Sequence, residues 1–293
     1  DPTVIVGSLL KSGTNFIGGK SDLFVVEACE YQRSFLNLSP EILVITNIDN
    51  DHLDYYGTMG EIQKAFAELV GKVPATGVIV CDPSDPLVAP VILKASARTV
   101  DYTKEALSVS LAVSGEHNIK NAKAALAVAR VLEVEGKEGE RLLAEFQGTW
   151  RRMEHKGTLP LGAEVYDDYA HHPTEINATL QGFRAKYPQG RIRVVFQPHL
   201  YSRTKLLLRD FSQSFKDADE VIVAPIYAAR ENPDPTISND ILVWEMAKHH
   251  PNPRLGNDFE SITAMLHENI SANDIIVTMG AGDIFKVGDR LLG

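Results

Sequence analysis

The fold is decided by EILVITNI (41–48), EIQKAFAELVGKV (61–73) and GVIVCD (77–82). The first and third runs are short and rich in β-branched residues, which is typical of buried strands. The middle run places apolar residues at helical spacing. A strand, a helix and a second strand in this order form a βαβ unit, so the first half is predicted to be α/β, with a sheet covered by helices. Upstream, DLFVVEA (22–28) predicts another strand.

A pair of helices is predicted after these strands. HNIKNAKAALAVARVLE (117–133) is rich in alanine and other strong helix formers, and KEGERLLAEFQ (137–147) predicts a second helix beyond Gly136. We expect this pair to close a first domain that covers residues 1–149.

The second half alternates strand and helix patterns again. Strands are predicted at EVYDDYA (164–170), IRVVFQ (192–197), EVIVAPI (220–226) and DIIVTMG (274–280). Helical patterns separate them, around residues 176–187, 205–215, 240–250 and 258–270. The alternation predicts a Rossmann-like, doubly wound α/β domain over residues 150–293. In such sheets ligands bind at the carboxyl ends of the strands, so the polar residues there are the candidate site.

Composition restricts the class of protein. The net charge of −10 and the lack of a cluster of basic residues with interleaved aromatics argue against nucleic acid as a partner. No run reaches the ~18 apolar residues of a membrane helix, and the N-terminus lacks a signal-peptide pattern. We therefore expect no membrane partner and a cytoplasmic location.

Two strands of the first half end in possible metal ligands. FVVEACE supplies Glu27 and Glu30, and VITNIDNDHLD supplies Asp51 and His52. Carboxylates with one histidine suit Mg²⁺, which takes few protein ligands and keeps water or phosphate oxygens, better than Zn²⁺. The alternative is that each acidic cluster is a solvated loop.

The segment GEHNIKNAK (115–123) places polar side chains on the first turn of a predicted helix. His117, Asn118 and Asn121 lie one turn apart there, and amide side chains can recognise an adenine edge or a ribose hydroxyl. The alternative is that Asn118 or Ser114 only caps the helix.

Three strand ends of the second half carry further candidates. YDDYAHHPTEI places Asp168 and His171 after a strand, with histidines suited to proton handling or phosphate contact. VVFQPHLYSRTK places His199 and Arg203 in one loop, and Arg151 and Arg152 add positive charge. The alternative for Arg203 is a surface ion pair. MGAGDI has two glycines, at 280 and 282, which either let backbone amides approach a ligand or make a tight turn.

A phosphate-binding loop of the form G-x-x-x-x-G-K-[ST] is not found. The nearest segment, TNFIGGKS (14–21), has Thr14 where the first glycine belongs. A strand pattern follows Ser21, so we expect no helix N-terminus to face a phosphate there.

Seven motifs nevertheless occur in an order that resembles the Mur ligases of peptidoglycan synthesis, from about residue 1 to the C-terminus. They are EACEYQRSFL, TNIDNDHLDYY, GEHNIKNAKAAL, RRMEHKG, DDYAHHPTE, FQPHLYSRT and MGAGD. The resemblance implies an ATP-dependent ligase that joins a carboxylate to an amine through an acyl phosphate, with ATP and Mg²⁺ as cofactors. Within the family it implies UDP-N-acetylmuramate and L-alanine as substrates, in cell-wall synthesis.

The resemblance also implies roles for individual residues. It assigns Glu27 and His52 to Mg²⁺, with Glu30 and Asp51 in support. It assigns His117, Asn118 and Asn121 to adenine and ribose, and Arg152, Asp168 and His171 to nucleotide contact. It assigns His199 and Arg203 to the substrate carboxylate or phosphoryl group.

The resemblance covers the family's central ATPase domain, entered late, and its C-terminal domain. We therefore expect the UDP-binding domain and the phosphate loop to be missing from these 293 residues, and the isolated chain to be inactive. Two alternatives stay open. One is a relative that recycles muropeptides, and the other is a non-catalytic subunit of a split ligase.

Overall fold

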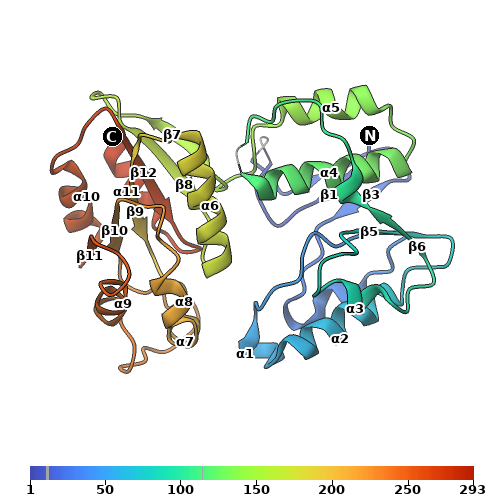
Figure 1. The fold of residues 1–293 in the computed structure, drawn as a ribbon, viewed down its shortest axis with the longest axis horizontal. Coiled ribbons are helices and arrows are strands. Elements are labelled where there is room, and N and C mark those ends of the chain that lie inside the picture. Colours follow the sequence, from blue (N-terminus) through green and yellow to red (C-terminus); the bar gives the residue numbers. More distant parts are fainter. Residues whose placement is uncertain (11–12, 114) are drawn as a thin grey trace. The chain divides into compact units, whose positions relative to one another are not determined.

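The computed structural model describes residues 1–10, 13–113 and 115–293. They form two compact units, residues 1–147 and 148–293, and we expected a boundary between 149 and 150 (Figure 1). Each unit is described on its own. Within the described ranges, no helix has both the length and the apolar character that crossing a membrane requires.

The first unit opens with a small mixed sheet in the order β2-β1-β3. β1 (Thr3–Ile5) pairs antiparallel with β2 (Phe16–Ile17) and parallel with β3 (Phe24–Val26). β3 is the strand predicted at 22–28, and it pairs within this sheet, separately from the strands that follow it in sequence.

A second sheet of the first unit contains the predicted βαβ unit. β4 (Ile42–Val44), β5 (Val78–Cys81) and β6 (Arg98–Asp101) are all parallel, in the order β4-β5-β6. Ile79 and Cys81 pack in one hydrophobic cluster with residues of α2, whereas Val78 and Val80 pack with residues of α4. Helices therefore cover both faces, as the apolar strand sequence requires.

The helices that the structure describes in this unit are three that begin within two residues of the predicted patterns (61–73, 117–133 and 137–147) and two short ones that were not predicted. They are α1 (Leu53–Tyr56), α2 (Met59–Val70), α3 (Ala89–Ile92), α4 (Glu116–Val131) and α5 (Gly136–Glu145), with 3₁₀ turns η1 (Tyr31–Asn37) and η2 (Tyr102–Lys104). The Thr58 hydroxyl caps α2 by accepting a hydrogen bond from the Glu61 amide. Gly115, with φ of 105°, precedes α4, so Asn118 lies inside the first turn and is not the N-cap; Ser114 lies outside the described residues.

The second unit contains a six-stranded sheet in the order β11-β10-β9-β12-β8-β7. β7 pairs antiparallel with β8, and the other neighbours are parallel. The strands are β7 (Glu154–Thr158), β8 (Glu164–Asp168), β9 (Arg191–Phe196), β10 (Glu220–Val223), β11 (Pro253–Leu255) and β12 (Asp274–Met279). The helices are α6 (Pro173–Lys186), α7 (Tyr201–Leu206), α8 (Leu208–Ser212), α9 (Asn239–Met246), α10 (Phe259–His267) and α11 (Phe285–Leu292).

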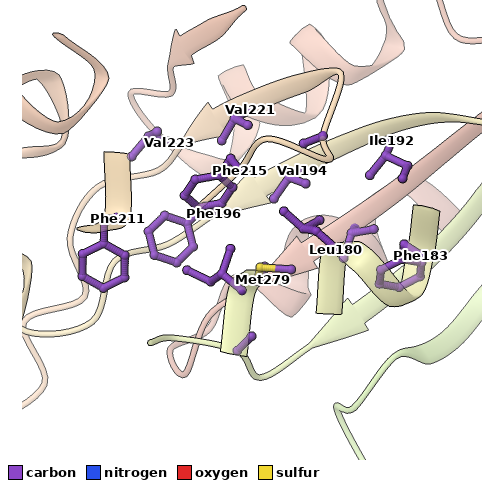
Figure 2. Close-up of a cluster of buried hydrophobic side chains, with 14 of the residues drawn as sticks. Leu180, Phe183, Ile192, Val194, Phe196, Phe211, Phe215, Val221, Val223 and Met279 are labelled. Carbon is purple, nitrogen blue, oxygen red and sulfur yellow. The ribbon is translucent and has the colours of Figure 1, made fainter. Parts of the chain in front are cut away.

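Two separate cores on this sheet show that it is doubly wound. Side chains of α6, α8 and α9 pack with Phe196, Val221 and Met279 in the cluster of Figure 2. Side chains of α10 and α11 pack with the alternate strand residues Val195 and Ile222. Successive strand side chains point to opposite faces, so one set of strands supplies both cores and confirms the predicted α/β fold.

Candidate functional site

In the first unit, the loops after β3 and β4 bring Glu30, Asp51 and His52 together. Each of the three half-buried side chains offers a ligand atom within 4.8 Å of the others. His52 Nε2 lies 3.2 Å from Glu30 Oε1 and 3.8 Å from Asp51 Oδ2. These three side chains are close enough together to bind one cation.

Local contacts hold this cluster in place. Asp51 Oδ1 accepts a hydrogen bond of 2.7 Å from the His52 amide, and the His52 backbone adopts a left-handed φ of 54°. The Tyr56 hydroxyl donates to the Glu30 carbonyl, and the Tyr31 ring lies 4.8 Å from the His52 ring. The hydrogen bond with His52 is the main reason why the pKa of Glu30 lies below its ordinary value, although burial acts in the opposite direction. Glu30 is therefore ionised at neutral pH, as a metal ligand must be.

Glu27, expected as a Mg²⁺ ligand with His52, lies outside this group of three. Its exposed side chain follows β3, and Oε2 accepts a hydrogen bond of 2.7 Å from the Gly7 amide. The structure therefore does not bring Glu27 together with His52 within the group that it describes.

The donor set of the cluster fits Mg²⁺. Two carboxylates and one imidazole supply few protein ligands, mostly hard oxygen atoms, and Mg²⁺ completes such a shell with water and phosphate oxygens. Zn²⁺ in structural sites takes four protein ligands, usually cysteine and histidine. Glu30, Asp51 and His52 are therefore the residues that would hold the ion.

The expected adenine-binding residues lie on the first two turns of α4. His117 and Asn118 are half-buried, and Asn121 is exposed. A Cβ atom at Gly115 would lie 2.6 Å from His117 Cε1, so the imidazole lies against the backbone that begins the helix. Asn118 and Asn121 are three residues apart and share one side of the turn.

The segment TNFIGGKS has a structural role in the first unit. β3 follows it, which confirms the expectation that no helix begins there. The Lys20 and Ser21 amides both donate to the Asp1 carbonyl, and a Cβ atom at Gly19 would lie 2.2 Å from the Pro2 carbonyl carbon. These glycine and amide groups pack against the start of the chain.

In the second unit, Arg151 is buried and ties two loops together. Its Nε donates to Asp167 Oδ2 at 2.6 Å, Nη2 to the Gly280 carbonyl at 2.7 Å and Nη1 to the Gly282 carbonyl at 3.0 Å. The side chain is only 4% exposed. Burial raises the pKa of Asp167, while Arg151 lowers it. Arg151 therefore joins the ends of β8 and β12, a role that the RRMEHKG motif alone did not reveal.

The adjacent Arg152 is solvent-exposed and belongs to a group of three expected nucleotide contacts. Arg152 Nη1 lies 3.2 Å from Glu175 Oε1 on α6. His171 Nδ1 lies 3.3 Å from Glu175 Oε2, so Glu175 connects Arg152 and His171. Asp168 is buried, and its oxygens accept hydrogen bonds from the Met153 and Ala170 amides at 2.7 and 2.8 Å. Burial raises the pKa of Asp168 to about 6.

His199 and Arg203 lie in and after the loop that follows β9. The His199 and His171 rings are 5.9 Å apart and nearly perpendicular. Burial, followed by the positive neighbours His171, Arg203 and Arg230, lowers the pKa of His199 to about 4. His199 is therefore an uncharged imidazole at neutral pH, and Arg203 supplies positive charge beside it.

The two glycines of MGAGDI allow close packing of the loop after β12. Gly280 has φ of 145°, and a Cβ atom there would lie 2.6 Å from the Gln197 carbonyl oxygen. A Cβ atom at Gly282 would lie 2.3 Å from Gln197 Oε1. Of the two interpretations of these glycines, the structure therefore favours a tight turn, which packs against the loop after β9. The Gly280 and Gly282 carbonyls accept hydrogen bonds from Arg151.

Comparison with known proteins matches both units to domains of the Mur ligases, the family that the sequence motifs resemble. The Mur ligase middle domain matches residues 8–106, and the Mur ligase, glutamate ligase domain matches residues 151–282. The UDP-N-acetylmuramate–L-alanine ligase of Desulfitobacterium hafniense is 41% identical, across all of this chain and 71% of that relative. The enzyme of the same name from Caldanaerobacter subterraneus is 40% identical, across all of this chain and 69% of the relative.

A solved structure agrees with these matches. The UDP-N-acetylmuramate–alanine ligase of Thermotoga maritima superposes with a TM-score of 0.79 and 25% identity, covering 99% of this chain and 68% of that one. The chain thus spans about 70% of the length of the curated relatives it matches. From its two matched domains, its identity to these relatives and its fold, the chain belongs to the Mur ligase family of ATP-dependent ligases.

Proposed function

We propose that this chain supplies the metal-binding and C-terminal parts of an enzyme that joins L-alanine to the carboxylate of UDP-N-acetylmuramate. The single observation that supports this most strongly is 41% identity to a UDP-N-acetylmuramate–L-alanine ligase across the whole chain. The γ-phosphoryl group of ATP is transferred to a muramoyl carboxylate oxygen, which gives an acyl phosphate and ADP. The alanine amine then attacks the acyl carbon, and inorganic phosphate leaves with that oxygen. Because ATP and a nucleotide sugar are the proposed substrates, we propose a cytoplasmic location for the reaction.

The first unit holds the nucleotide in this proposal. Glu30, Asp51 and His52 would hold Mg²⁺, and Glu27, in the loop after β3 as Glu30 is, is proposed as a further ligand. An ion held there would neutralise negative charge on the phosphates. The first two turns of α4 offer Asn118 and Asn121 as hydrogen-bond partners for adenine and ribose.

In this proposal the second unit contacts the nucleotide and stabilises charge on the carboxylate and the phosphoryl group. Arg152 and His171, linked through Glu175, contact the nucleotide, and buried Asp168 fixes their loops by accepting the Met153 and Ala170 amides. Arg203 stabilises negative charge on the carboxylate and phosphoryl oxygens. His199 adds an uncharged hydrogen-bonding group.

The metal site is tested with Mn²⁺ as a paramagnetic probe on the 293-residue chain. We expect Glu30→Gln to weaken Mn²⁺ binding at least about tenfold, because the variant loses a charged ligand. Asp49→Asn is the matched control, since Asp49 Oδ1 instead accepts from the Asn50 amide. Electron paramagnetic resonance titration measures free Mn²⁺. Equal affinity of Glu30→Gln and the wild type would remove Glu30 from the site, and Glu27→Gln tests the proposed fourth ligand in the same way.

Ligation is tested with and without a phosphate loop. No segment of the 293 residues matches G-x-x-x-x-G-K-[ST], so we propose that they form no product alone. A chimera that adds the unmatched part of the D. hafniense relative is expected to convert UDP-N-acetylmuramate and L-alanine to the ligated product with release of ADP and phosphate. Ligation by the 293 residues alone would refute the need for a phosphate loop. A folded chimera without ligation, beside an active D. hafniense enzyme, would contradict the proposed function.

A further inference from the structure

Tyr227, in the loop after β10, is attached to His199 through both backbone and ring. The Tyr227 amide donates to the Pro198 carbonyl at 2.8 Å, and the Leu200 amide donates to the Tyr227 carbonyl at 2.9 Å. These two hydrogen bonds flank an isolated parallel bridge between His199 and Tyr227. The two rings stack with centroids 5.7 Å apart and an interplanar angle of 17°. The His199 ring thus lies nearly parallel to the Tyr227 ring.

The Tyr227 ring is itself held by the loop after β12. A Cβ atom at Gly282 would lie 2.7 Å from Tyr227 Cγ, so only glycine leaves room for the ring in this position. The Gly282 carbonyl is in turn fixed by the buried guanidinium of Arg151. The sequence IYAARE gave no signal for this contact, because the residues involved are more than fifty positions apart.

The protonation of the His199 imidazole depends on its burial and on the charged groups around it. Its Nδ1 atom is buried and finds no hydrogen-bond partner among the residues that the structure describes. The charged and titratable groups that act on it are His171, Arg203, Arg230 and Glu231. Because three of these four are basic, a proton on His199 would be repelled as well as poorly solvated. Removing a ring that covers the imidazole should admit water and ease protonation.

We propose that Tyr227 is a positioning residue for His199: its stacked ring and backbone bridge fix the plane of the imidazole and shield it from water. His199 then meets the substrate as an uncharged hydrogen-bonding group beside Arg203. This role deepens the proposed ligase function and rests on it, whereas the contact between the two rings is independent of any substrate.

The test is an NMR titration of the histidine rings in the ligand-free 293-residue chain from about pH 3 to pH 7.5, a range that includes the wild-type midpoint near 4. The His199 signal is assigned by its loss in His199→Gln. Tyr227→Phe keeps the stacked ring and should leave the His199 midpoint within about 0.3 pH units of wild type. Tyr227→Met removes the ring and should raise the midpoint by about one pH unit. Tyr169→Met is the matched control, because the Tyr169 ring packs on His171 and should move that signal more than the signal of His199.

An unchanged His199 midpoint in folded Tyr227→Met would overturn the proposal. Loss of the folded spectrum in Tyr227→Met would also overturn it, by showing that the ring supports the core and not the imidazole. Neither result depends on ligation. The ligation assay could therefore contradict the proposed function while the titration confirms the role of Tyr227, or the titration could contradict that role while ligation is observed.

Discussion

Arg151→Ala is expected to destabilise the second unit by about 3–5 kcal/mol, because removing one partner of a buried ion pair leaves the other uncompensated. Asp167 would lose its 2.6 Å contact and remain 1% exposed, and the Gly280 and Gly282 carbonyls would each lose a donor. Urea unfolding followed by tryptophan fluorescence measures the loss. The two tryptophans, Trp150 and Trp244, both lie in this unit, so the signal is specific to it.

Arg152→Ala is the matched control for this prediction. Arg152 is adjacent in sequence, but its side chain is 46% exposed and forms an ion pair with Glu175 at the surface. A surface pair of this kind contributes at most about 1 kcal/mol. Similar unfolding midpoints for wild type and Arg151→Ala would show that the buried guanidinium does not hold the loops after β8 and β12 together.

Arg203→Ala is expected to lower ligation about 10²–10³-fold in the active chimera, with little loss of stability. An arginine aimed at charge that develops in the reaction contributes this much when the site excludes water. The residue lies on the short helix α7 and is only half-buried, so the core does not depend on it. Arg203→Lys keeps the charge without the planar pair of donors and should give an intermediate rate. Steady-state release of ADP, measured with saturating ATP, gives the rates.

Lys205→Ala controls for the loss of any positive charge from α7. Lys205 is exposed and pairs with Asp234 and Thr236 in the same unit. Its removal should change the rate less than about twofold, since surface ion pairs contribute little. Equal rates for Arg203→Ala and Lys205→Ala would mean that Arg203 has no special part in the reaction.

Much of the fold could be predicted because its strands are short apolar runs between helical patterns. The runs at 192–197 and 274–280 became β9 and β12, which are buried on both faces. Pairing was harder to foresee, because periodicity shows that a strand exists but not which neighbour it joins. The run at 22–28 therefore joined a separate small sheet with β1 and β2.

At the candidate site too, the motifs identified residues of the right type but did not show which of them lie together. Motif reading placed His52 together with the supporting candidates Glu30 and Asp51, which the structure brings within 4.8 Å of one another. It gave no means of separating Glu27, the first residue after β3, from Glu30 three positions later. It also could not tell Arg151 from Arg152, because burial depends on contacts with residues 280 and 282, far along the chain.

The central claim is that L-alanine is the amino acid joined to UDP-N-acetylmuramate, and an acceptor competition tests it most directly. The chimera is incubated with ATP, Mg²⁺, UDP-N-acetylmuramate and equimolar L-alanine and muropeptide tripeptide. Mass spectrometry then identifies and quantifies the two ligated products. We predict that the alanine product exceeds the tripeptide product at least about tenfold, a difference of about 1.4 kcal/mol in transition-state binding. A predominance of the tripeptide product would contradict the account and assign the chain to muropeptide recycling.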